Sequence, residues 1–136
     1  MEITEFELKK IKPYENNPRK KKDIEKVANS IKEYGWQQPI VIDEDNIIIV
    51  GHSRYLAAKK LQMAKVPVVI AKNLTDEQIK GYRIADNKTN EYSEWDYELL
   101  HQELEKLMGK GFDLNNLGFG DKELDAIINF DGSGTE

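Results

Sequence analysis

The chain has 136 residues, of which 39% are hydrophobic and 33% charged, enough for a domain with a real core and too apolar for a disordered chain. Because Cys is absent, disulfides, thiolate metal sites and cysteine nucleophiles are excluded, and two His leave little for a His-rich metal centre. No apolar run approaches membrane-spanning length and no signal-peptide pattern opens the chain, so we expect a cytoplasmic protein with no membrane partner, while the net charge of −5 argues against strong unaided DNA binding.

Strands and helices are expected along most of the chain. In chain order they are a strand at 3–12, a turn at 16–19, a helix at 24–34, strands at 40–42 and 47–50 that form a hairpin, a helix at 53–61, a strand at 66–70, a helix at 76–85 and helices at 97–108 and from 121 on. β-Branched runs favour the strands, and apolar residues at helical spacing favour the helices. Pro67 suggests a strand start or an edge strand. Thr75 and Gln78 match a capping box.

The stretch 47–61 predicts a strand, a glycine turn and a helix. Gly51 lacks a Cβ, which permits a sharp turn and the close approach of another group. The first turn of a helix carries unpaired backbone N–H groups and a partial positive charge, which together favour anions. Arg54 falls in that turn, where its planar fork could hold a phosphate, and His52 and Ser53 add polar groups. A surface arginine, a structural histidine and a capping serine fit the same pattern.

Several motifs then recur in a recognisable order. They are Asn17-Pro18-Arg19, Gln38-Pro39-Ile40-Val41-Ile42, Gly51-His52-Ser53-Arg54-Tyr55, Val66-Pro67-Val68 and Asp86-Asn87. This order, over residues 5–92, resembles the N-terminal domain of the ParB family, also labelled a ParB-like nuclease domain, which shares a fold superfamily with sulfiredoxin. The run 83–88 with Glu94-Trp95-Asp96 is similar to the ParB-like domains of phages and mobile elements, some of them fused to DNA methyltransferases.

The resemblance implies an α+β fold in which a small mixed sheet carries packed helices. We expect a nucleotide-binding domain at residues 1–92, an α-helical extension at 93–130 and a disordered tail at 131–136. The implied function is binding, with or without hydrolysis, of a nucleoside triphosphate (CTP or ATP) with Mg²⁺, in the DNA metabolism of a phage or mobile element.

The resemblance also implies a set of site residues. The family's Gly-Glu-Arg-Arg phosphate motif matches Gly51, His52, Ser53 and Arg54, and its Glu-Asn pair matches Asp86 and Asn87. The implied phosphate ligands are Gly51, His52, Ser53, Arg54 and Arg19, the implied metal ligands are Asp86 and Asn87, and the implied catalytic groups are Asp86 and His52. A carboxylate and an amide oxygen suit Mg²⁺. Weak DNA contact, directly or through a partner protein, would fall to Lys20, Lys21 and Lys22.

The chain departs from the family pattern at informative places. His52 and Ser53 replace a Glu and an Arg, which removes one charge-assisted phosphate contact. Sulfiredoxin chemistry is excluded because it needs a Cys where His52 stands. After residue 92 only two short helical segments are expected, so we do not expect spreading along DNA as a clamp, and the oligomeric state stays open.

Other functions remain open from the sequence. One is a non-catalytic DNA-binding or adaptor module that recruits a DNA methyltransferase or another DNA-processing enzyme through the apolar face of residues 97–108. A second is a metal-dependent DNA nuclease centred on Asp86, although no dense acidic cluster accompanies it. A third is a small-molecule kinase, because a phosphate cradle and one carboxylate serve several acceptors.

Overall fold

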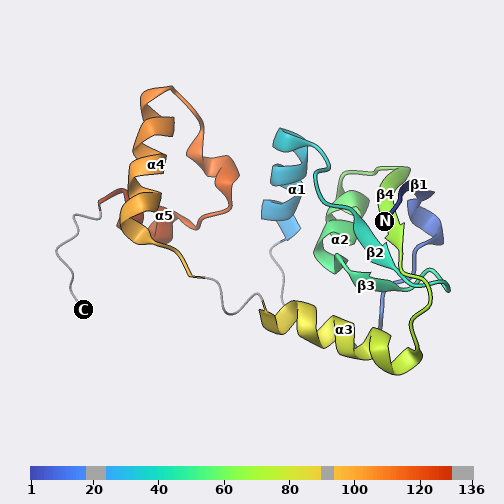
Figure 1. Cartoon of the computed structure of the whole chain (residues 1–136). Helices are drawn as coiled ribbons and strands as arrows, with labels where there is room; N and C mark the ends of the chain where they lie inside the picture. The colour runs from blue at the N-terminus through green and yellow to red at the C-terminus, as the bar shows by residue number, and fades with distance from the viewer. Residues whose placement is uncertain (18–23, 90–93, 130–136) are drawn as a thin grey trace. The chain divides into compact units, whose positions relative to one another are not determined.

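The computed structural model describes residues 1–17, 24–89 and 94–129. The chain divides into two compact units, Met1–Tyr92 and Ser93–Glu136. The first unit contains a four-stranded sheet with helices, and the described part of the second is helical (Figure 1). The expected α+β class with a small mixed sheet is therefore confirmed.

The sheet contains β1 (Ile3–Glu7), β2 (Ile40–Ile42), β3 (Ile48–Val50) and β4 (Lys65–Ile70) in the order β1-β4-β2-β3. β4 runs antiparallel to β1 and parallel to β2, and β2 pairs antiparallel with β3. The hairpin expected from residues 40–50 is confirmed, since Val41 faces Val50 across β2 and β3. Asp43 closes the hairpin turn, because its Oδ1 accepts the backbone N–H of Ile47 at 2.9 Å.

Two strand predictions are wrong. The strand predicted at 3–12 ends at Glu7 and continues as a 3₁₀ turn, η1 (Leu8–Lys10). This turn places Leu8 and Ile11 on one side of the chain, three residues apart, and both are buried in the core. The edge position predicted from Pro67 is also wrong, because β4 lies between β1 and β2. The strand tolerates Pro67 because β2 begins pairing only opposite Val68.

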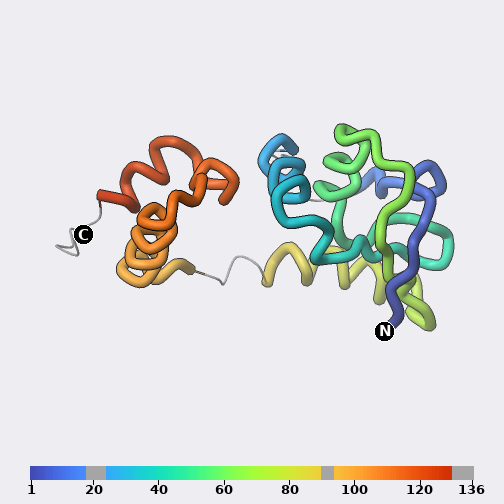
Figure 2. Tube along the Cα trace, turned by 90° about the horizontal axis from the view of Figure 1, so that it is seen from above, coloured from blue at the N-terminus to red at the C-terminus, as the bar shows by residue number. Residues whose placement is uncertain are grey.

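Three helices surround the sheet of the first unit. They are α1 (Ile24–Tyr34), α2 (His52–Lys60) and α3 (Asp76–Thr89). α1 packs on α2, α2 contacts β2, and α3 runs along β3, the edge strand (Figures 1 and 2). The capping box at the start of α3 is confirmed, because Gln78 N–H donates to Thr75 Oγ1 at 3.1 Å and Thr75 N–H donates to Gln78 Oε1 at 2.9 Å. The core of the unit gathers Ile40, Ile42, Ile48, Val66 and Val68, all fully buried.

The second unit contains α4 (Tyr97–Gly109), a 3₁₀ turn η3 (Leu114–Leu117) and α5 (Asp121–Ile128). Leu104 of α4 and Ile127 of α5 are its buried residues. The last helix begins at Asp121, as expected, and Gly120 is its N-cap residue. Within the described ranges, no helix is long and apolar enough to cross a membrane.

Candidate functional site

The turn between β3 and α2 requires glycine. Gly51 has φ 109° and ψ 28°, in the left-handed region that side chains disfavour. A Cβ built there would lie 3.3 Å from Cγ1 and 3.4 Å from Cα of Ile40, which is fully buried. The glycine therefore brings the start of α2 against β2 and positions the three residues that follow it.

The first turn of α2 has the charge pattern of an anion site. α2 begins at His52, so His52, Ser53 and Arg54 all lie in this turn, which contains no acidic residue. No side chain caps the helix at Gly51. A cation in the first turn is unfavourable against the helix dipole, whereas an anion placed there gains from both the dipole and the guanidinium. The arrangement is therefore compatible with an anion at the start of α2.

Arg54 joins three parts of the first unit. Its Nη2 donates a hydrogen bond to Oε1 of Gln38, in the loop before β2. Partial burial lowers the pKa of the Arg54 guanidinium, and the carboxylate of Asp86 on α3 opposes that shift. The sequence-predicted Arg54 and Asp86 therefore interact electrostatically, although they lie on different helices.

His52 is held by the loop after η1. The backbone N–H of Tyr14 donates to His52 Nε2 over 3.1 Å, so this nitrogen acts as an acceptor. The imidazole must then carry its proton on Nδ1 when it is neutral. This contact ties residues 14–17 to the Gly51 turn.

Arg83 is a residue of the site region that the sequence patterns did not indicate. It is buried on α3, its Nε donates to the carbonyl of Ile48 over 3.0 Å, and its guanidinium carbon lies 3.6 Å from the ring centroid of Tyr14. These contacts fix α3 against β3 and against the loop that holds His52. A buried arginine is rare unless paired, so apolar periodicity could not reveal it. Its Tyr14 partner is 69 residues away in sequence.

The two candidate metal ligands lie in the last turn of α3. Asn87 Nδ2 donates to the carbonyl of Arg83 over 3.0 Å, so its amide nitrogen is turned toward its own helix. Among the described residues there is no group of three or more His, Asp or Glu side chains that could hold an ion. Mg²⁺ commonly takes one or two protein ligands and completes its shell with phosphate oxygens and water, so Asp86 and Asn87 fit it only together with a phosphate ligand.

Arg19, Lys20, Lys21 and Lys22 lie outside the described residues, so their predicted phosphate and DNA contacts stay predictions.

Comparison with known protein families shows which family the chain belongs to. Residues 1–88 match the model of the ParB N-terminal domain. The chain belongs to this family. Residues 98–136 match a second model, described as the ParB-methyltransferase HTH domain. The sequence patterns gave only helices for this part of the ParB-type chain and did not identify a helix-turn-helix domain.

Two curated relatives illustrate the family. The ParB-like nuclease domain-containing protein YnaK of Escherichia coli is 42% identical over 73 residues, which cover 52% of this ParB-type chain and 84% of that protein. A probable chromosome-partitioning protein ParB of Rickettsia prowazekii is 41% identical over 76 residues, covering 54% of this chain and 27% of the relative. The chain thus matches only about a quarter of the length of the partitioning protein.

Solved structures share the fold. A C-terminally truncated ParB from Caulobacter crescentus, complexed with CTP-γ-S, has a TM-score of 0.71 at 18% identity and covers 94% of this chain and 85% of that one. Sulfiredoxin from Arabidopsis thaliana has a TM-score of 0.50 at 25% identity, covering 60% of this chain and 97% of that one. The expected ParB and sulfiredoxin-like fold is confirmed.

Proposed function

We propose that the first unit binds a nucleoside triphosphate, with its phosphates at the Gly51–Arg54 turn. The observation that carries the proposal is the first turn of α2, which combines a left-handed Gly51, no acidic residue and a partly buried Arg54. CTP is the first nucleotide to test, because the ParB structure from Caulobacter crescentus with this fold contains CTP-γ-S.

Different groups would contact the phosphates and the metal ion. Backbone N–H groups at the start of α2 and the Arg54 guanidinium would hold phosphate oxygens, and Gln38 orients that guanidinium. Asp86 and Asn87 would hold Mg²⁺, which supplies charge neutralisation to the phosphates. The contact of His52 with Tyr14 favours a positioning role for His52 over a catalytic one. If hydrolysis occurs, Asp86 is the carboxylate next to Arg54 that could orient water.

The experiment measures the rise in melting temperature that CTP and Mg²⁺ produce, because a ligand that binds only the folded state stabilises it by an amount that increases with the logarithm of its affinity. Arg54→Ala removes a charge-assisted contact and should weaken binding roughly 10- to 100-fold, while Arg54→Lys should lie between that variant and the original protein. Lys60→Ala is the matched control, since it removes a cation from the opposite end of α2. An unchanged nucleotide response in a folded Arg54→Ala variant would refute the site.

We also propose that the chain acts in DNA metabolism beside a DNA methyltransferase, in a phage or mobile element. Support comes from the match of residues 98–136 to the model of the ParB-methyltransferase HTH domain, whose description names both proteins. Co-purification of the chain with a DNA methyltransferase produced in the same cells would test this role. Failure of the two proteins to associate, with and without CTP, would contradict it.

A further inference from the structure

Charge is divided unevenly between the two units. Residues 1–92 contain seventeen Lys and Arg against fourteen Asp and Glu, a net charge of +3, whereas residues 93–136 contain three Lys against eleven Asp and Glu, a net charge of −8. A domain that grips a DNA duplex relies on Lys and Arg contacts to phosphates for much of its affinity. The unit that matches a helix-turn-helix model therefore has the wrong sign of charge for unaided DNA binding.

The same unit contains an apolar groove. A hollow of about 400 Å³ lies between α4, η3 and α5, and its lining includes Trp95, Leu100, Leu107 and Phe119. Trp95 is 55% exposed, and its ring centroid lies 5.7 Å from that of Phe119. Phe119 is half-buried, and an exposed tryptophan beside an apolar groove is a common feature of surfaces that bind another protein.

Two carboxylates border this groove. Glu103 of α4 and Glu123 of α5 are among its lining residues, on opposite helices. Glu103 also pairs with Lys106 of its own helix at 3.3 Å, but both side chains are exposed, and such pairs contribute little and exchange partners readily. An apolar centre with acidic edges complements a segment whose apolar side chains are flanked by Lys or Arg.

We propose that the groove of the second unit docks a helical segment of a partner protein, with leucine or aromatic anchors in the hollow and basic residues beside Glu103 and Glu123. The unit is then a protein-docking module, and contact with DNA passes through its partner. This inference does not depend on the nucleotide site, because every residue it uses belongs to residues 93–136.

The test uses the full chain and a defined probe. The probe is a fluorescent amphipathic peptide of Leu and Lys, with leucines at helical spacing, and its counterpart carries Glu in place of every Lys. We expect the Lys peptide to bind, the Glu peptide to fail, and binding to weaken as salt rises. The double variant Glu103→Gln and Glu123→Gln should bind the Lys peptide roughly three- to tenfold more weakly. Gln at position 123 keeps an oxygen that can accept the Gly120 N–H, so the helix cap is preserved.

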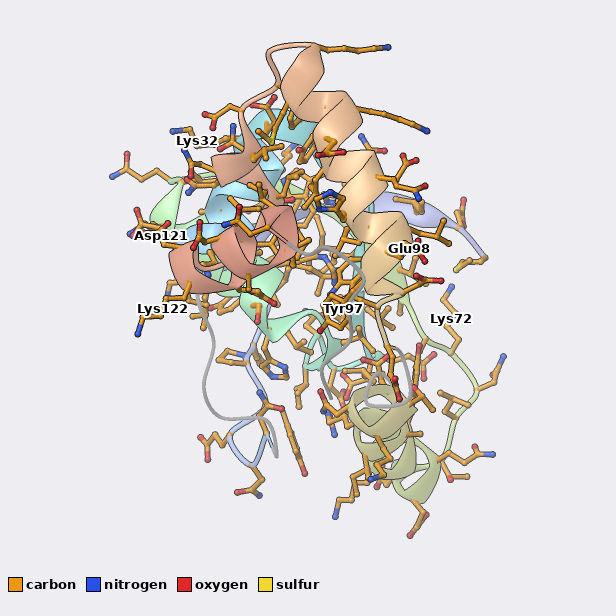
Figure 3. All side chains as sticks on the ribbon, turned by 90° about the vertical axis from the view of Figure 1, so that its left-hand side faces the viewer. Lys32, Lys72, Tyr97, Glu98, Asp121 and Lys122 are labelled. Atoms are coloured by element: carbon orange, nitrogen blue, oxygen red, sulfur yellow. The ribbon has the colours of Figure 1, made fainter. Side chains whose placement is uncertain are left out.

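The matched control removes two charges from the other side of α4. Glu98 and Glu105 fall outside the groove, and Figure 3 shows Glu98 on the side of α4 away from α5. Glu98→Gln with Glu105→Gln should leave peptide binding nearly unchanged. Equal loss in both double variants, or equal binding of the Lys and Glu peptides, would overturn the proposal. So would a dimer that only the Glu103 and Glu123 substitutions dissociate, since this would give the groove to a second copy.

Discussion

Replacement of Gly51 by Ala tests the turn that positions the candidate phosphate site. At φ 109° an L-residue pays roughly 1–2 kcal/mol in backbone strain. The new methyl group would also lie 3.3 Å from Cγ1 of Ile40, which is fully buried and cannot move aside without disturbing the core. Overpacking of this kind costs roughly 1–3 kcal/mol. The free energy of unfolding should therefore fall by about 2–5 kcal/mol in Gly51→Ala.

Gly81 provides a matched control in the same unit. It lies inside α3, and a Cβ built on it meets no atom within 4 Å. Ala is a better helix former than Gly, so Gly81→Ala should raise the free energy of unfolding by about 0.5–1 kcal/mol. The same chemical change should thus have opposite effects at the two positions.

Urea unfolding followed by Trp36 fluorescence measures both effects. Trp36 packs against the core of the first unit, and a Trp95→Phe background removes the signal of the second unit. The urea midpoint of Gly51→Ala should fall by about 1 M or more, and that of Gly81→Ala should rise. Equal midpoints for the two variants, or a Gly51→Ala variant as stable as the original protein, would refute the steric argument.

Three further substitutions test the surroundings of the site. Arg83→Leu removes the donor to the Ile48 carbonyl and the stack on Tyr14. The free energy of unfolding measured in urea should therefore fall by about 2–4 kcal/mol. A fall of less than about 1 kcal/mol would contradict these contacts. His52→Ala removes the acceptor of the Tyr14 N–H, so hydrogen exchange at that amide should become faster in NMR spectra, and unchanged exchange would mean that the bond does not form in solution. Asp86→Asn replaces a charged Mg²⁺ ligand by a neutral one, so it should weaken the Mg²⁺ dependence of nucleotide binding in melting assays with and without EDTA, and full retention would exclude Asp86 as a ligand.

Local features of this fold could be predicted from the sequence because neighbouring residues determine them. Helical spacing gave α1 with its correct ends, and the β-branched run before Gly51 gave the strand and helix that flank the turn. The capping box at Thr75 also formed as expected. Each of these depends on residues within a few positions of one another.

Long-range features could not be predicted in the same way. The position of β4 between β1 and β2 depends on pairing between distant segments, and of the two positions that Pro67 suggested, a strand start or an edge strand, the edge is wrong. The hydrogen bond from Tyr14 to His52 spans 38 residues, and the burial of Arg83 contradicts the usual exposure of arginine. The candidate role of Arg54 came from the strand–turn–helix pattern as well as from the family resemblance, and that of Asp86 came from the resemblance alone. The structure adds that the carboxylate of Asp86 acts on the Arg54 guanidinium, which no local pattern contains.

Calorimetric titration of the full chain with CTP, ATP and GTP, first with Mg²⁺ and then with EDTA, tests the nucleotide site most directly. We predict saturable binding of CTP that weakens when Mg²⁺ is removed. Without the metal, the side-chain oxygens of Asp86 and Asn87 would face the phosphate oxygens with no cation between them. Absence of heat with all three nucleotides, from a chain whose circular dichroism shows the folded α+β unit, would contradict a phosphate site at the Gly51–Arg54 turn.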